Sequence, residues 1–331
     1  DYIMNTLGGN LIRITVSVPA WLGKWEKNGQ TWNDPGGKNY RNKIDQVINE
    51  ISKAGKYAVL DMHAYNRFNS PDHLEFWDTA AERYKNNPTV LFGILNEPTC
   101  DWDEWLNGDT TPGDVNGQKS VGHQYMVERI RDLGAKNIII AGGPSYSGTL
   151  SKIGTNEGYD LIDRGSNNDL SKAGNGIMYD YHRYPLHGST STWIKGADAA
   201  RKKHPILMGE FGWQAGLLNH NPKPTDATYH TQWFPAIFDW INDYETYGNY
   251  CNWTAFAFHP TSGPPMLVKK DNWYLDFELN TVFGTYIRDE LKRIQNSTSL
   301  TRYKIPSASS TEDTSDARNA TDGDDATAWI S

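Results

Sequence analysis

The nonapeptide VLFGILNEP, residues 90–98, indicates the architecture that we expect for the whole chain. It is a short, continuous apolar run that ends in Asn96, Glu97 and Pro98. Such a run predicts a strand buried on both faces, as in a parallel sheet covered by helices. Because Pro98 cannot donate a hydrogen bond to a sheet, we expect the strand to end there. The sequence therefore predicts Glu97 at the carboxyl end of a buried strand, the end at which barrels of such strands carry out their chemistry.

A second apolar run, PILMGEFG at residues 205–212, delivers Glu210 in the same way. Either glutamate by itself could be no more than a solvated strand end. Two carboxylates at strand ends, however, suit the hydrolysis of a glycosidic bond, in which one donates a proton and the other attacks the sugar or activates water. A mechanism that retains the configuration of the sugar needs the two carboxyl groups roughly 5–5.5 Å apart. We therefore expect folding to bring Glu97 and Glu210 together.

Apolar runs alternate with amphipathic stretches along most of the chain. The expected strands are residues 10–18, 57–62, 90–98, 137–141, 176–181, 205–212 and 250–258. The expected helices are residues 38–54, 71–87, 118–133, 192–203, 227–244 and 281–295. This alternation predicts an α/β protein with a parallel sheet, namely a (β/α)8 TIM barrel over residues 1–296. Seven strands are found rather than eight, so we expect the first strand to be missing from this chain. Residues 297–331, rich in Ser, Thr and Asp, indicate a linker and the start of a β-sandwich module.

The composition disfavours several classes of protein. The 331 residues carry a formal net charge of −8, which disfavours nucleic acid as a partner because phosphate binding requires a basic surface. No apolar run approaches the roughly 20 residues that span a membrane. Asp1 is not an initiator residue, so a secretory leader could have been removed. Cys100 and Cys251 fall at opposite ends of their expected strands, and we expect no disulfide between them.

Four further polar side chains accompany the expected strands. Arg13 lies inside an apolar strand, where a buried charge must be paired; the alternative is that it points outward to the helices. His63 directly follows its strand and is either a substrate contact or merely a polar strand terminus. His182 and Tyr184 share one face if their segment is extended. At that position Tyr184 could hydrogen-bond a catalytic carboxylate.

Residues from about Leu7 to Gln295 resemble glycoside hydrolase family 5, the cellulase family of the large clan of retaining barrels. The resemblance rests on the motifs ERYKNNPTVLFGILNEP, DMHAY, YHRYP, PILMGEFGW and NWTAFAFHP. It implies that Glu97 is the acid/base and Glu210 the nucleophile. It also implies a set of substrate-binding residues, namely Arg13, His63, Asn96, His182, Tyr184 and Trp253. The C-terminal tail resembles the first strand of a discoidin-like (F5/8 type C) carbohydrate-binding module.

The resemblance implies a role for most of these residues. Asn96 would hold the sugar 2-hydroxyl, and Trp253 would form the floor of the subsite whose bond is broken. Arg13 and Tyr184 would keep Glu210 ionised and oriented. The reaction would be a double displacement, in which Glu97 enters protonated and Glu210 forms a glycosyl-enzyme. No metal or other cofactor would be required.

The sequence leaves the substrate and two rival functions open. A β-1,4-glucan is the expected polymer, but a β-mannan or another β-glycan would use the same catalytic set. A metal-dependent hydrolase with His63 and His182 as ligands is a weaker alternative, because such barrels usually offer an H-x-H pair with Asp ligands. The second rival function is that of a non-catalytic barrel that binds glycans. An enzyme that acts on an extracellular polymer would be secreted or held at the cell surface, and we expect a monomer.

Overall fold

The computed structural model of this chain describes residues 2–27, 30–31, 33–68, 70–109, 120–185, 190–213, 232–249 and 251–296. The chain divides into two compact units. One comprises Asn10–His182 and is called the Glu97 unit here; the other comprises Asp1–Gly9 with Arg183–Ser331 and is called the Glu210 unit. The module predicted for residues 297–331 lies outside the described residues.

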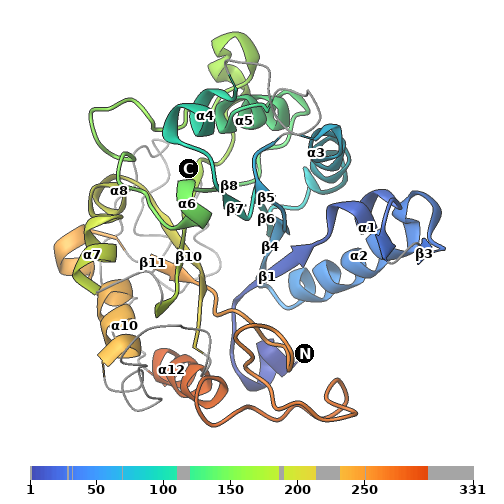
Figure 1. Cartoon of the computed structure of the whole chain (residues 1–331), viewed down its shortest axis with the longest axis vertical. Helices are drawn as coiled ribbons and strands as arrows, with labels where there is room; N and C mark the ends of the chain where they lie inside the picture. Colours follow the sequence, from blue (N-terminus) through green and yellow to red (C-terminus); the bar gives the residue numbers. More distant parts are fainter. Residues whose placement is uncertain are drawn as a thin grey trace. The chain divides into compact units, whose positions relative to one another are not determined.

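Five strands of the Glu97 unit form one parallel sheet, in which neighbours follow one another along the chain (Figure 1). In spatial order they are β1 (Leu11–Val16), β4 (Tyr57–Met62), β6 (Val90–Gly93), β8 (Ile139–Gly142) and β9 (Ile177–Arg183), the last residue of which falls in the other unit. The register pairs Arg13 with Val59, Phe92 with Ile139, and Asp180 with Gly142. These five strands therefore run in one direction, and their carboxyl ends lie along the same edge of the sheet.

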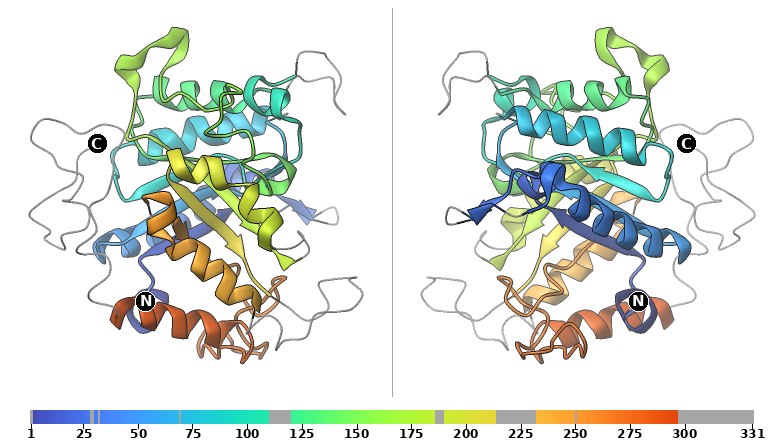
Figure 2. Two further views of the ribbon diagram at one scale, coloured as in Figure 1. Left: turned by 90° about the vertical axis from the view of Figure 1, so that its left-hand side faces the viewer. Right: turned by 90° about the vertical axis from the view of Figure 1, so that its right-hand side faces the viewer.

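Helices lie between these strands along the chain. They are α1 (Val18–Leu22), α2 (Lys38–Lys53), α3 (Pro71–Tyr84), α4 (Trp102–Asn107), α5 (His123–Asp132) and α6 (Pro144–Ser147). In Figures 1 and 2, α2, α3 and α5 lie on the same side of the strands. On α2 the buried residues Ile44, Ile48 and Ile51 recur at helical spacing, which gives the helix one apolar face for the sheet.

The Glu210 unit contains two parallel strands, β10 (Ile206–Phe211) and β11 (Cys251–Trp253), which pair Met208 with Trp253. Its helices are η1 (Tyr2–Thr6), α7 (Thr190–Lys195), α8 (Asp198–Lys203), α10 (Phe234–Asn242), α11 (Tyr244–Tyr247) and α12 (Gly284–Asn296). The core of this unit is rich in aromatic and aliphatic residues of α10, since Phe234, Ile237 and Trp240 are all buried.

The seven predicted strands are confirmed in position, and so is their alternation with helices. Several boundaries are wrong. The region expected as a loop after residue 18 contains α1, and the expected loop after residue 98 contains α4. The expected helix 192–203 is two helices, α7 and α8. Among the described residues, Cys100 and Cys251 are free and buried, and no helix is long and apolar enough to cross a membrane.

The predicted end of the strand 90–98 is wrong in a way that affects the site. β6 ends at Gly93, and Glu97 lies in a separate two-residue strand, β7 (Glu97–Pro98), which pairs with β5 (Tyr65–Asn66). The N–H groups of Phe92 and Ile94 donate towards β8, whereas the N–H of Asn96 donates to Met62 at the end of β4. The alternation of the strand is therefore broken between Ile94 and Asn96, and a one-residue slip turns side chains to the opposite face.

Candidate active site

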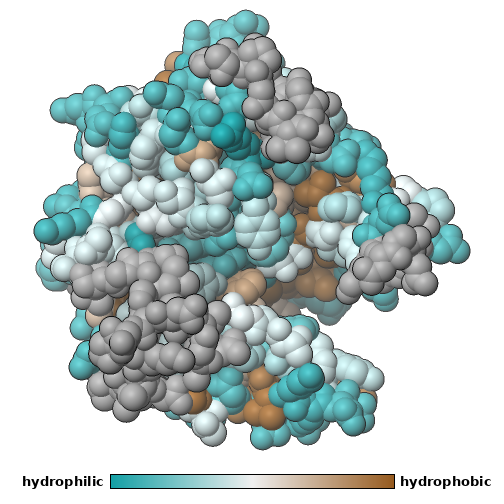
Figure 3. All heavy atoms as spheres, viewed as in Figure 1, coloured by the Kyte–Doolittle hydropathy of each residue, from teal (hydrophilic) through white to brown (hydrophobic). Residues whose placement is uncertain are grey.

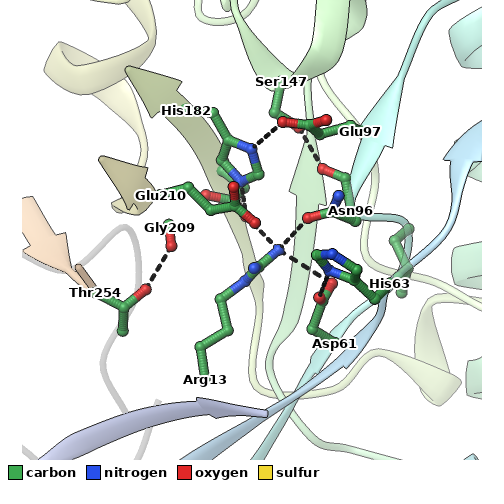
Figure 4. Close-up of polar contacts among 12 residues, drawn as sticks. Arg13, Asp61, His63, Asn96, Glu97, Ser147, His182, Gly209, Glu210 and Thr254 are labelled. Carbon is green, nitrogen blue, oxygen red and sulfur yellow. Dashed lines mark hydrogen bonds and ion pairs between the residues drawn. The ribbon is translucent and has the colours of Figure 1, made fainter. Parts of the chain in front are cut away.

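Arg13 is buried on β1 and is surrounded by polar groups at the carboxyl ends of neighbouring strands (Figure 4). Its Nη2 donates to Oδ1 of Asn96 at 2.6 Å. The same nitrogen is 3.1 Å from Oδ1 of Asp61 and 4.0 Å from Oδ2 of Asp180, as ion pairs. The prediction that a buried Arg13 must be paired is confirmed, and its contacts show that it does not point to the helices. One cation thus serves two carboxylates that are almost completely buried.

Asn96 is fixed from two directions. Its Oδ1 accepts the hydrogen bond from Arg13, and its main-chain carbonyl accepts one from the Ser147 hydroxyl at 2.7 Å. Because a guanidinium can only donate, the oxygen of the amide must face Arg13 and the NH2 group must point away. That buried Nδ2 has no hydrogen-bond partner among the described residues. The amide therefore presents a donor that an incoming hydroxyl group could satisfy.

Glu97 has one oxygen held by a fully buried imidazole. Nδ1 of His182 lies 3.0 Å from Oε1 of Glu97, and Nε2 of the same ring lies 3.3 Å from Oδ2 of Asp180. The Glu97 side chain keeps 16% of its surface exposed, whereas the ring of His182 has none. β9 continues to Arg183, so His182 is part of the strand and not, as the sequence predicted, a residue beyond its end. The strand itself thereby aims the ring at Glu97.

His63 lies after β4 and has a carboxylate of its own. Its Nδ1 is 2.8 Å from Oδ2 of Asp61, while Nε2 is 3.4 Å from the Tyr65 hydroxyl. His63 also borders a pocket of about 440 Å³ beside α1 and α3, where Figure 3 shows hydrophobic residues at the surface. The pocket is lined by Thr15, Ser17, Val18, Pro19, His63, Ala64, Ser70, Asp72 and His73. Its mixture of hydroxyl groups, imidazoles and apolar carbons is suited to a polar ligand with apolar faces.

The Glu210 unit holds its carboxylate through a phenol. The hydroxyl of Tyr184 donates to Oε2 of Glu210 at 2.8 Å, and Glu210 is 4% exposed. The predicted hydrogen bond from Tyr184 to a carboxylate is therefore confirmed. The preceding residue, Gly209, is held by its carbonyl, which accepts from the Thr254 hydroxyl at 2.6 Å (Figure 4). The end of β10 is thus fixed both at its backbone and at the carboxylate.

Trp253 packs within the Glu210 unit. Its ring lies edge-on to Phe211 on β10 and to Phe238 on α10, with centroids 5.7 and 5.4 Å away. These contacts are those of a packing residue beside the helix layer. The sugar contact that the resemblance implies for Trp253 stays a prediction.

Sequence reasoning missed the two aspartates, Asp61 and Asp180, and also Ser147. A signal for the aspartates was present, because D-M-H at 61–63 and D-Y-H at 180–182 repeat one spacing. Residues two apart on a strand share a face, so each Asp lies beside its His. Within either unit alone, the described residues contain no group of three His, Cys, Asp or Glu that is close enough to hold a metal ion.

Parallel strands with carboxylates, imidazoles and a guanidinium at their carboxyl ends define the chain as an α/β protein of the kind that has its site at the strand ends. The family model for Cellulase (glycosyl hydrolase family 5) matches residues 2–258, so the chain belongs to that family.

Curated proteins that are similar to this chain include endoglucanases. The chain is 24% identical over 236 residues to a probable endo-β-1,4-glucanase B of Aspergillus niger, a match that covers 62% of this chain and 65% of the relative. It is 26% identical to endoglucanase A of Butyrivibrio fibrisolvens, over 69% of this chain and 47% of the relative. The chain thus spans about two thirds or less of the length of these relatives.

Two crystal structures show the fold. β-Glucanase SdGluc5_26A from Saccharophagus degradans aligns with a TM-score of 0.63 and 20% identity, over 89% of this chain and 81% of that one. The catalytic domain of Thermobifida fusca endoglucanase Cel5A (E5) aligns with a TM-score of 0.57 and 15% identity, over 88% and 84%. The prediction of a (β/α)8 fold is therefore confirmed.

Proposed function

We propose that the chain is a retaining endo-β-1,4-glucanase with Glu97 as acid/base and Glu210 as nucleophile. The observation that carries the proposal is that each of the two carboxylates has one oxygen in contact with a buried or partly buried side chain. His182 contacts Oε1 of Glu97 and Tyr184 donates to Oε2 of Glu210. Family membership and the endoglucanase names of the relatives support the same reading.

The proposed reaction has two steps. In the first, Glu210 attacks the anomeric carbon while Glu97 protonates the departing glycosidic oxygen, so a glycosyl-enzyme forms and one sugar product leaves. In the second, Glu97 takes a proton from water, which attacks the anomeric carbon and releases Glu210. The configuration at the anomeric carbon is inverted twice and therefore retained.

The remaining predicted residues would bind the glucan. The buried NH2 group of Asn96, which lacks a partner among the described residues, would donate to the 2-hydroxyl of the sugar that is cleaved. His63 would contact a sugar in the pocket that it borders. Arg13 would supply positive charge to the site, and Trp253 would stack on a sugar ring.

The test is turnover of a soluble β-1,4-glucan, followed by the release of reducing ends. Glu97→Gln and Glu210→Gln should each lower turnover by at least about a thousandfold while glucan binding, measured by affinity electrophoresis, remains. Glu128→Gln is the matched control, because Glu128 is a partly buried helical glutamate paired with Arg164. Full activity in either test variant would refute the assignment, and binding without turnover in the wild type would favour a glycan-binding barrel.

A polysaccharide panel tests the substrate. We expect faster release of reducing ends from β-1,4-glucan than from β-mannan, and a rapid fall in the viscosity of the polymer, as endo cleavage produces. A preference for mannan would replace the glucanase with a mannanase that has the same catalytic pair. We also propose that the enzyme is a monomer, that it acts outside the cell, where its polymer is found, and that residues 297–331 open a carbohydrate-binding module.

A further inference from the structure

We propose that Asp180 is a positioning residue for Glu97: it holds His182 as a charged donor whose Nδ1–H binds Oε1 of the acid/base. The inference deepens the proposed function and rests on it. Oδ1 of Asp180 accepts the N–H of Tyr181 at 2.8 Å, and Oδ2 lies 3.3 Å from Nε2 of His182. Nδ1 of that ring lies 3.0 Å from Oε1 of Glu97. The contacts form one continuous chain from the backbone of β9 to the acid/base.

The two ring nitrogens of His182 both face carboxyl oxygens. A neutral imidazole has one N–H and one nitrogen with a lone pair. In that form one of the two contacts would place the lone pair of a ring nitrogen against a carboxylate oxygen, which is repulsive. The ring is completely buried, and therefore it cannot turn to water for a partner. Both contacts become hydrogen bonds when the ring carries two protons. The charge of Asp180 balances the second proton, and the same Oδ2 forms an ion pair with Arg13 at 4.0 Å.

A charged donor on Oε1 matters most when Glu97 gives up its proton. Among the described residues, Oε2 of Glu97 has no hydrogen-bond donor, so Oε2 is the oxygen left for the glycosidic oxygen. As the proton moves to the sugar, negative charge develops on the carboxyl group, and a donor already in place stabilises it. A hydrogen bond from a charged group is about twice as strong as one from a neutral group. Asp180 would thus accelerate cleavage of the glycosidic bond, and it would do so most for substrates whose leaving group takes up the most of the proton in the transition state.

Asp180→Asn removes the charge and keeps the shape. The N–H of Tyr181 requires an acceptor, so the amide oxygen would stay in the place of Oδ1 and the NH2 group would face Nε2 of His182. That group donates to Nε2 and leaves the ring with a single proton. The test measures kcat/KM on aryl β-cellobiosides with good (2,4-dinitrophenyl) and poor (phenyl) leaving groups, because kcat/KM reports the first bond cleavage and only a poor leaving group needs the proton.

We expect Asp180→Asn to lower kcat/KM about tenfold or more for the phenyl glycoside and less than about threefold for the dinitrophenyl glycoside. Asp163→Asn is the control: Asp163 pairs with the buried Arg131 in the same unit, and its loss should affect both substrates equally. An equal fall for both substrates in Asp180→Asn would overturn the proposal. A wild type that cleaves neither glycoside would refute the proposed function instead.

A second measurement is made on the wild type and does not depend on the activity of any variant. Nitrogen-15 NMR of the histidines in the wild type, with the His182 signals assigned from their loss in His182→Gln, reports the protonation of each ring nitrogen. We expect both nitrogens of His182 to carry protons at neutral pH. A ring with Nε2 or Nδ1 unprotonated would overturn the proposal, because Asp180 would then hold no charged donor against Glu97.

Discussion

Replacing Tyr184 by Phe removes the hydroxyl that hydrogen-bonds Glu210 and keeps the aromatic ring. The Tyr184 hydroxyl donates to Oε2 of Glu210 at 2.8 Å, the distance of a strong hydrogen bond to a carboxylate. Glu210 is almost completely buried, so water cannot easily take the place of the phenol. The phenyl ring of the variant fills the same space, which confines the perturbation to the oxygen atom.

The magnitude follows from the charge of the acceptor. A hydrogen bond to a charged group contributes about 1.5–3 kcal/mol. At about 1.4 kcal/mol for each factor of ten, its loss from the reacting state lowers kcat/KM by roughly 10–150-fold. The bond aligns Glu210 for attack on the anomeric carbon, and we therefore expect most of the loss in kcat rather than in KM.

The assay is steady-state cleavage of a soluble β-1,4-glucan with a matched control. Tyr84 on α3 also donates its hydroxyl to a carboxylate at 2.8 Å, that of Asp45, but it lies in the helix layer. Tyr84→Phe should lower stability by about 1.5 kcal/mol and leave kcat/KM unchanged. A fall of less than about threefold in Tyr184→Phe, or equal falls in both variants, would refute the view that this phenol orients the nucleophile.

Three further predictions concern stability and metal dependence. Complete burial lowers the pKa of His123 to about 3. Below pH 6.5 the unfolded chain therefore binds a proton at this histidine that the folded chain does not bind, and the free energy of unfolding decreases as the pH is lowered. His123→Gln should remove about 2 kcal/mol of the stability that is lost between pH 6.5 and pH 4.5, as measured by urea unfolding. Asn137 donates to the carbonyls of Tyr84, Asn87 and Val90, so Asn137→Ala should cost about 2–4 kcal/mol in thermal unfolding, and a loss under 0.5 kcal/mol would contradict that role. Dialysis against a chelator should leave glucan turnover unchanged; lost activity that zinc restores would favour the metal-dependent alternative.

The strands were predictable because their signal is local. Each is a short apolar run between polar segments, and burial on both faces requires such a run wherever it occurs. The short helices α1 and α4 were missed because five or six residues do not establish a helical period. Their N-cap residues were nevertheless visible in the sequence. The Ser17 side chain accepts a hydrogen bond from the N–H of Ala20, and the Asp101 side chain accepts one from the N–H of Glu104.

The direction of Asn96 could not be predicted from its strand. With unbroken alternation, Asn96 would share a face with Phe92, which packs against Trp77 of the helix layer. The backbone shift after Ile94 sends it to Arg13 instead. That shift depends on hydrogen bonds to Met62 and other distant residues, so it belongs to the tertiary structure, and no pattern within residues 90–98 could reveal it.

Arg13 was the most informative residue because it conflicts with its own surroundings. In the strand LIRITV a charge has no local justification, and burying it without a partner costs several kcal/mol. The buried aspartates need the arginine as much as the arginine needs them. Asp61 and Asp180 are each almost completely buried, and each would be costly without a cation. Both contact Arg13, and each in turn contacts a histidine at the strand ends. An arginine that breaks an apolar strand therefore predicts buried carboxylates on neighbouring strands, and the two D-x-H motifs are where they lie.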